Sequence, residues 1–263
     1  MHLITSKSFS LLVVLLLAMT GIGASHTLSR SPAELALQAS PAAPPRATPA
    51  AGDEFSIDFD SDSVNEGATD FVPLIGEWVV QADDSAPSQP NVYAQVGTQD
   101  LAPAATDAED VFGDAYTDLL DNIETYELFP STILDAGQYT NLDLSVSYKP
   151  ISGTVDQVGG LIFRATSPTD YYVWRCNVLE QDCRLFLYEN GKRTSLYEVA
   201  VTQDTGEWRR LRVVVEGDRI QGFLDDEMVM DFEDSTFQTG YVGLWTKADA
   251  VTAFDDFTVI TLP

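Results

Sequence analysis

Histidine and cysteine are almost absent from this sequence. The two histidines, His2 and His26, both lie in the first 26 residues. The rest of the chain therefore excludes a Ser-His-Asp or Cys-His mechanism and any zinc or iron site built on histidine. The two cysteines are Cys176 and Cys183, and if they are bonded to each other, no thiol nucleophile remains.

Lysine and arginine are also scarce, with 14 against 41 Asp and Glu, and the net charge is −27. Between residues 53 and 148 there are 21 acidic residues and no basic one. Such a charge repels phosphates, so we exclude nucleic acid and anionic membrane surfaces as partners. Two interpretations remain open: solubility in a salty or extracellular medium, and binding of a divalent cation by some of the carboxylates.

Only one long apolar run is present, from Leu11 to Met19, and the small residues GIGAS follow it. This order is typical of a secretory signal peptide, here residues 1–25, cleaved near Ala24 or Ser25. The run is shorter than the roughly 20 residues that span a bilayer. We therefore predict a secreted protein, extracellular or periplasmic, with no membrane insertion after cleavage. An uncleaved anchor is the alternative.

Residues 26–52 are rich in Ala, Pro and Ser and predict a flexible tether, because such residues bury too little surface to fold. Residues 53–263 then form one folded domain. Alternating apolar and polar residues recur through it between Gly, Asp and Asn turns, which predicts an all-β, antiparallel two-sheet sandwich. The expected strands are 55–59, 77–81, 92–96, 124–129, 142–149, 160–165, 171–178, 184–189, 196–201, 208–215, 219–224, 228–232, 241–245 and 253–260.

An acidic insertion at about residues 98–123 interrupts this pattern. Val111, Tyr116 and Leu119 follow helical spacing. We expect a short surface helix or an ordered loop, with a lid over a binding site as the alternative.

The segment around the cysteines predicts two consecutive hairpins. The second places Cys176 opposite Cys183, a geometry that suits a cross-strand disulfide. The first, with a turn at residues 166–170, pairs Arg164 with Tyr172. Alternation then puts Arg164, Tyr172 and Trp174 on one face, where a planar cation beside aromatic rings could hold a sugar. The alternative is a half-buried sheet that covers the arginine stem.

Several stretches carry a more specific similarity. They are Ala86–Gln95, Lys149–Ala165, Tyr171–Asn177, Glu189–Leu196, Glu207–Val229 and Gly240–Val259. In order and spacing they resemble secreted bacterial proteins with a laminin-G-like or concanavalin A-like jelly roll. The nearest group is the 3-keto-disaccharide hydrolase domain, which is loosely labelled as family-sixteen glycoside hydrolase. The resemblance covers nearly all of residues 53–262.

This resemblance implies that one face or loop rim meets carbohydrate. It does not establish catalysis, because the fold hosts lectins, binding modules and hydrolases. Laminarinase-type enzymes use a Glu-x-Asp-x-x-Glu strand, and the nearest run here, residues 231–234, lacks that spacing. Lys247 and Asp249 follow an expected strand end, where they could hold a sugar hydroxyl. Asp156 and Asp249 are the candidate catalytic carboxylates.

Our leading hypothesis is an exported carbohydrate-binding or scaffold domain. The first alternative is a hydrolase that acts on glycosides of the 3-keto-disaccharide type with carboxylates as acid and base. The second is a purely structural extracellular protein.

A structural calcium ion is a further hypothesis. Terminal strands pair in many jelly rolls, and calcium takes six to eight oxygen ligands. Alternation places Asp58, Asp60 and Asp62 on one face of the first strand, and Asp256 of the last strand could join them. Solvated charges at a sheet edge are the alternative.

Overall fold

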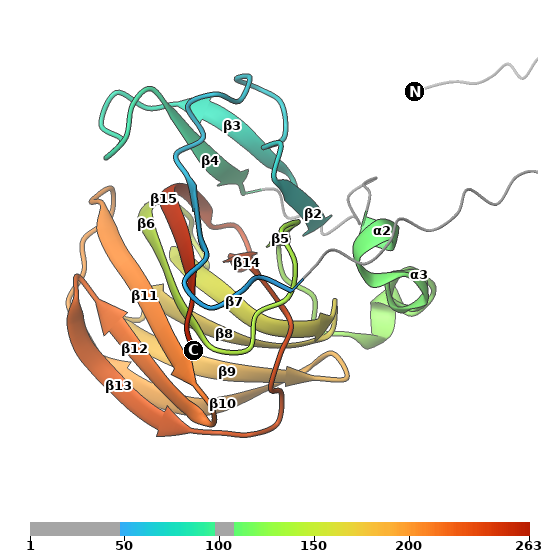
Figure 1. Ribbon diagram of the computed structural model, residues 1–263. Helices are drawn as coiled ribbons and strands as arrows, with labels where there is room; N and C mark the ends of the chain where they lie inside the picture. The colour runs from blue at the N-terminus through green and yellow to red at the C-terminus, as the bar shows by residue number, and fades with distance from the viewer. Residues whose placement is uncertain (1–47, 98–107) are drawn as a thin grey trace, which may run out of the picture. The chain divides into compact units, whose positions relative to one another are not determined.

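The computed structural model describes residues 48–97 and 108–263. The predicted signal peptide and all but the end of the predicted tether lie outside these residues. The described chain forms two antiparallel sheets stacked face to face, which confirms the all-β sandwich (Figure 1). Within these ranges no helix is both long and apolar enough to cross a membrane.

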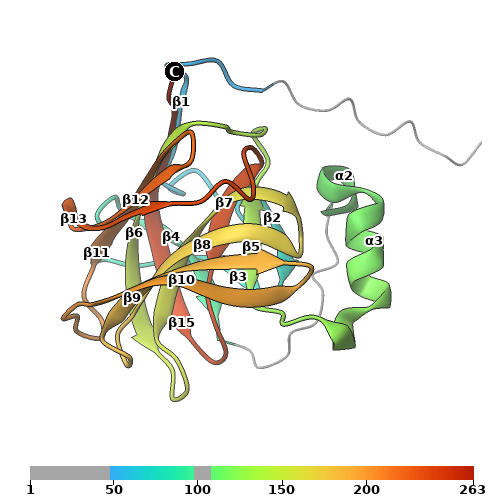
Figure 2. The ribbon, with the colours of Figure 1, turned by 90° about the horizontal axis from the view of Figure 1, so that it is seen from below.

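The first sheet, sheet A, has the strand order β13-β12-β11-β6-β15-β4-β3, and β1 also pairs with β15. The first and last strands of the domain are therefore neighbours, as predicted (Figure 2). The bounds are β1 (Glu54–Ile57), β3 (Trp78–Ala82), β4 (Asn91–Val96), β6 (Leu142–Ser152), β11 (Arg209–Glu216), β12 (Arg219–Leu224), β13 (Glu227–Glu233) and β15 (Val251–Thr261).

The second sheet, sheet B, has the order β10-β9-β8-β7-β14-β5-β2. Its bounds are β2 (Phe71–Ile75), β5 (Ser131–Leu134), β7 (Val158–Ser167), β8 (Asp170–Asn177), β9 (Asp182–Glu189), β10 (Lys192–Ala200) and β14 (Tyr241–Trp245).

The core lies between the sheets and takes alternate residues from each strand. Sheet A contributes Leu144, Val213 and Phe254, and sheet B contributes Leu161 and Trp174, all without exposed surface. Burying a large apolar side chain stabilises the fold by about 1.5–3 kcal/mol. This core therefore fixes which face of each strand points inward.

The face of sheet B turned away from sheet A carries a second apolar cluster, which the short helices α2 (Ala108–Phe112) and α3 (Asp114–Asp121) partly cover (Figure 2). Tyr116 and Leu119 of α3 are buried there, while the aspartates of α3 face away. Gly113 joins the two helices at a φ of 55°, a conformation that glycine adopts readily. The helical spacing in the insertion is thus real from residue 108 onward; residues 98–107 lie outside the described part.

The strand prediction needs correction at three places. The expected strand at 124–129 is a 3₁₀ turn, Ile123–Thr125, followed by extended chain without ladder pairing. The pattern also missed β2 and β5. Pro73 interrupts the β2 pattern, and proline is tolerated because β2 is the last strand at its end of sheet B.

Of the two predicted hairpin pairings, one is confirmed and the other is wrong. Cys176 lies opposite Cys183 and the disulfide is formed, which confirms that prediction. The predicted pairing of Arg164 with Tyr172 is wrong, because Phe163 takes that place and the next partners are Ser167 and Asp170. Arg164 has a φ of 49° within the bulge that produces this shift.

The predicted calcium ligands form no metal site in the described part of the chain, although Asp58 and Asp60 lie near enough to Asp256 for their charges to raise its pKa. Strand β1 ends at Ile57, so the alternation that placed Asp58, Asp60 and Asp62 on one face does not extend to them. Asp60 accepts a hydrogen bond from the Asn91 amide at 3.0 Å, and Asp62 accepts two from Thr69. Among the described residues, neither these aspartates with Asp256 nor any other acidic, histidine or cysteine side chains form a group of three suited to a metal.

Candidate functional site

The predicted sugar-binding trio of Arg164, Tyr172 and Trp174 is buried, with no exposed surface on any member. Trp174 extends across the core and donates from its indole nitrogen to the Phe223 carbonyl of sheet A at 3.3 Å. Tyr172 packs there against Phe163, with ring centroids 5.2 Å apart. The prediction that this face is open to a glycan is therefore corrected: it is the face that packs against the other sheet.

Arg164 joins three loops at one end of the sandwich. Its guanidinium donates to the carbonyls of Thr140, Phe237 and Gly217 at 2.7–3.2 Å. All of these acceptors are neutral backbone atoms, and the charge faces no solvent. Arg164 therefore has a structural role, which is to hold these three loops together through its hydrogen bonds.

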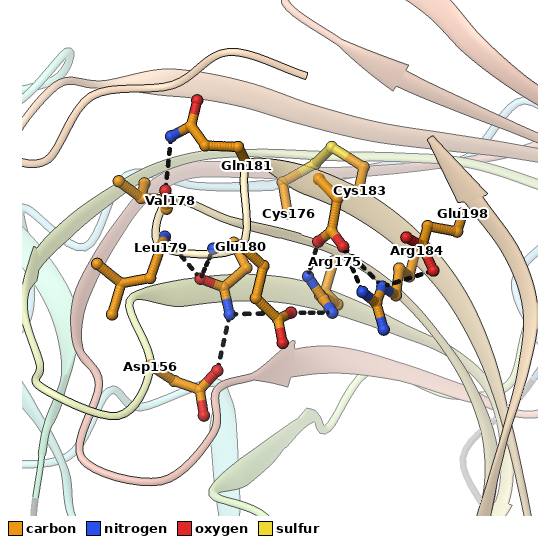
Figure 3. A network of polar contacts seen from close by, with 12 residues as sticks. Asp156, Arg175, Cys176, Val178, Leu179, Glu180, Gln181, Cys183, Arg184 and Glu198 are labelled. Atoms are coloured by element: carbon orange, nitrogen blue, oxygen red, sulfur yellow. Dashed lines mark hydrogen bonds and ion pairs between the residues drawn. A yellow bond between two sulfur atoms is a disulfide. The ribbon is translucent and has the colours of Figure 1, made fainter. Parts of the chain in front are cut away.

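The opposite face of sheet B carries a different arrangement, which we call the polar cluster (Figure 3). Its members come from the end of β8, the start of β9, the β8–β9 turn, the β6–β7 loop and the segment after β14. They are Asp156, Arg175, Asn177, Glu180, Asp182, Arg184 and Lys247.

Asn177 organises one half of the polar cluster. Its amide nitrogen donates to Asp156 at 2.7 Å and to Glu180 at 3.3 Å, while its oxygen accepts from the Leu179 and Glu180 amides. Lys247 places its ammonium 3.0 Å from the Asp156 carboxylate. The turn that holds Glu180 is thus connected to the loop that holds Asp156 (Figure 3).

Arg175 and Asp182 organise the other half. Arg175 forms ion pairs with Asp182 and, at 2.6 Å, with Glu180. Arg184 bonds the second oxygen of Asp182 at 2.6–2.7 Å and reaches the more exposed Glu198 at 3.3 Å. Alternation along β8 and β9 puts these arginines on the outer face, because their neighbours Cys176 and Cys183 point into the core (Figure 3).

Aromatic rings lie on the same face beside the polar cluster. Tyr171 and Tyr188 stack at 4.5 Å, and Phe129 lies 5.3 Å from Trp245. The Arg175 guanidinium lies 5.4 Å from the ring centre of Phe186. Tyr171, Phe186, Tyr188 and Trp245 are at most 4% exposed, so these rings pack beside the polar cluster and only its charged groups reach the surface.

Asp249 is used in folding the neighbouring loop. Its carboxylate accepts the backbone amides of Thr154, Val155 and Asp156 at 2.7–3.1 Å. These bonds, led by that of Thr154, lower the pKa of Asp249. A carboxylate held ionised in this way is a poor proton donor. Asp249 therefore positions Asp156 and is poorly suited to be a general acid.

Exposure separates the members of the polar cluster into two layers. The side chains of Arg175, Asp182 and Asp156 are 3%, 6% and 2% exposed. Those of Glu180, Arg184 and Lys247 are 37%, 26% and 24% exposed. The outer three can meet a ligand, and the inner three hold them in place.

The sequence singled out only Lys247, Asp156 and Asp249 from this region. Lys247 and Asp156 do meet, whereas no ion pair joins Lys247 to Asp249 in the described structure. Arg175, Glu180, Asp182 and Arg184 were missed as site residues. One feature of the sequence could have indicated them: charged residues recur between positions 175 and 184, on strands whose other face carries the two cysteines.

Comparison with known proteins agrees with the resemblance stated from the sequence. Residues 130–260 match the family model of the 3-keto-alpha-glucoside-1,2-lyase-like domain, which confirms that resemblance over this part of the predicted span of residues 53–262. A 103-residue stretch is 31% identical to levanase from Bacillus subtilis, and it covers 38% of this chain but only 15% of the levanase.

Two solved structures are similar in fold. The carbohydrate binding module CBM66 from Bacillus subtilis has a TM-score of 0.48 at 24% identity, over 50% of this chain and 81% of its own. A Bacillus licheniformis β-glucanase has a TM-score of 0.47 at 10% identity, over 81% of this chain and 99% of its own.

Proposed function

We propose that this domain binds a neutral carbohydrate on the outer face of sheet B, at the polar cluster. The observation that carries the proposal is the concentration of cations at this cluster within a strongly acidic protein. Three cations, Arg175, Arg184 and Lys247, pair there with four carboxylates, Asp156, Glu180, Asp182 and the more exposed Glu198. The cluster therefore offers donors and acceptors together, as sugar hydroxyls require.

The partly exposed members are the proposed ligand contacts. Lys247 and Arg184 would donate to sugar oxygens, and Glu180 would accept from a sugar hydroxyl. The buried Arg175 and Asp182 would hold the charged groups of Glu180 and Arg184 in place. Binding would then cost less side-chain conformational entropy.

The sequence similarity to a known enzyme suggests which chemical class of glycan to test. The partial identity with levanase makes fructans the first class to test. The described disulfide fits an oxidising compartment, so we infer an exported protein, in line with the predicted signal peptide.

Binding to levan, inulin and a mixed-linkage β-glucan can be measured by affinity electrophoresis and calorimetry. We expect at least one fructan to bind and the double variant Lys247→Ala/Glu180→Ala to lose more than ~90% of the affinity, as for two charge-assisted hydrogen bonds. The matched control is Arg219→Ala, which removes an exposed ion pair with Asp231 on sheet A. Equal loss in the control, or no binding to any glycan, would contradict the proposal.

The family match supports a second candidate, cleavage of a 3-keto glycoside. Because the described chain lacks histidine, we propose a carboxylate as the base. Asp156, beside Lys247, is the candidate. Release of free sugar from a 3-keto glucoside by wild type, but not by Asp156→Asn, would establish it. No release by wild type would dispose of it.

A further inference from the structure

Two turns at the polar cluster each present an apolar side chain to solvent. Val155 lies on the β6–β7 loop and is 63% exposed, and Leu179 lies on the β8–β9 turn and is 47% exposed. The other exposed large apolar residues of the described chain are Val64, Ile151 and Met228. Neither Val155 nor Leu179 packs against an apolar cluster of the described residues. The hydrophobic core therefore does not explain why these two positions are apolar.

The two turns are joined to each other and to the charged groups of the polar cluster. The Asn177 amide nitrogen, from the end of β8, donates to Asp156 of the β6–β7 loop at 2.7 Å. Val155 directly precedes Asp156 in the chain, and Leu179 directly precedes Glu180. Figure 3 shows Leu179 beside Glu180 on the β8–β9 turn. Each exposed apolar side chain is thus the neighbour of a charged member of the polar cluster.

A polar side chain fixes the backbone beneath each of these apolar groups. The Asp249 carboxylate accepts the Val155 amide at 2.9 Å, and the Asn177 side-chain oxygen accepts the Leu179 amide at 2.9 Å. Both bonds use backbone atoms, so the turns themselves do not require an apolar residue at either position, and turns usually carry small or polar residues. An apolar group on a fixed backbone loses little conformational freedom when a ligand packs against it.

The size and chemistry of this surface suit a sugar better than a protein. A stable protein interface buries at least about 1,000 Å², far more than two side chains offer. A small-molecule site instead combines apolar contact with a few placed polar groups. We propose that Val155 and Leu179 form the apolar half of the carbohydrate site. They pack against the CH groups of a sugar while Lys247 and Glu180 bond its hydroxyl groups, so this inference rests on the proposed function.

Calorimetry of the full-length chain tests this assignment, with levan, inulin or the mixed-linkage β-glucan as the probe, whichever wild type binds most tightly. Leu179→Asn keeps a similar side-chain shape but makes it polar, and it should weaken binding about fivefold. Val155→Thr should weaken binding about threefold, and Leu179→Met should retain the affinity. The heat capacity change of binding should be less negative in the Leu179→Asn protein, because less apolar surface is buried.

A matched control is Val64→Thr, which changes a valine that is 44% exposed beside β3 of sheet A and should leave affinity unchanged. All of these variants should keep the wild-type melting temperature, because the altered side chains lie at the surface. Wild-type affinity in the double variant Val155→Thr/Leu179→Asn, or an equal loss in Val64→Thr, would overturn the inference and leave the proposed function standing. Failure of wild type to bind any of the three glycans would overturn both.

Discussion

Two buried arginines of sheet B, Arg164 and Arg175, illustrate two uses of the same side chain. Arg164 is bonded only to backbone carbonyls, in a place without exposed surface. Arg175 is bonded to the carboxylates of Asp182 and Glu180, and these join more exposed side chains. The first arrangement has no part that a ligand could reach. The second extends from the sheet to the surface, so burial alone does not distinguish a structural arginine from a binding one.

Removal of Arg164 should have the largest effect on stability. Arg164→Met leaves the carbonyls of Thr140, Phe237 and Gly217 without their donor, and we expect the free energy of unfolding to fall by about 4 kcal/mol. Denaturant unfolding measures this change. The affinity of the folded fraction for a glycan should be unchanged, and loss of that affinity would show that the two arginines are not functionally separate.

Removal of Arg175 should affect both stability and binding. Arg175→Met leaves Asp182 buried beside a single remaining cation, Arg184, and should cost about 3 kcal/mol. Glycan affinity should be lost as well, because Glu180 loses its ion pair and keeps only the 3.3 Å hydrogen bond from Asn177. The double variant Arg175→Met/Asp182→Leu should recover part of the stability but no binding. Recovery of binding would assign the ligand contacts elsewhere.

Asp255 extends the comparison to a buried carboxylate whose bonded groups are neutral. Ser88 donates to it from backbone and side chain at 2.7–2.8 Å, yet burial raises its pKa to about 6. A carboxyl whose pKa is higher in the folded state stabilises the fold below its unfolded pKa of about 3.9, and that contribution is lost as the pH rises through about 6.

Stability should therefore fall between pH 4 and pH 7 by about 1–3 kcal/mol from this group. Urea unfolding across that range measures the change. Asp255→Asn removes the titrating group and should flatten the profile relative to wild type, with the general repulsion of other carboxylates left as background. Parallel profiles in the two proteins would contradict the assignment.

Lys247 should show the smallest effect on stability and still matter for binding. Lys247→Gln leaves the buried Asp156 carboxylate without its cation but with its hydrogen bond from Asn177, and should lower the free energy of unfolding by about 1–2 kcal/mol. Glycan affinity should fall roughly tenfold, as for one charge-assisted contact. Calorimetry on wild type, Lys247→Gln and the control Lys192→Gln, a residue of the exposed strand β10, makes the test.

The sequence predicted most of the fold because alternation reports local strand geometry. Thirteen of the fourteen expected strands correspond to strands of the structure, and residues 176 and 183 pair as expected. The predicted register between β7 and β8 was wrong because one extra residue in a bulge changes the alternation. The bulge at Arg164 shifts the β7–β8 register, so Leu161 and Phe163, rather than Ile162, share a face with Trp174.

The site could be predicted only in part for the same reason. Both faces of β8 and β9 are rich in apolar residues, so composition could not decide which face meets the other sheet. The decision depends on contacts between distant segments, such as the close approach of Gly222 to Trp174. Lys247 and Asp156 are 91 positions apart in the chain, and their contact is likewise a product of the tertiary fold.

The disulfide between Cys176 and Cys183 has a consequence for recognition as well as for stability. A shift of one residue between β8 and β9 would reverse the faces of one strand relative to the other, so that Arg175 or Arg184 would turn toward the core and apolar residues would replace it outside. The covalent bond forbids that shift, because these two positions must remain opposite each other. The oxidation state of two core residues thus determines the spacing of charges on the far side of the strands, and an oxidising compartment would maintain the shape of the recognition surface.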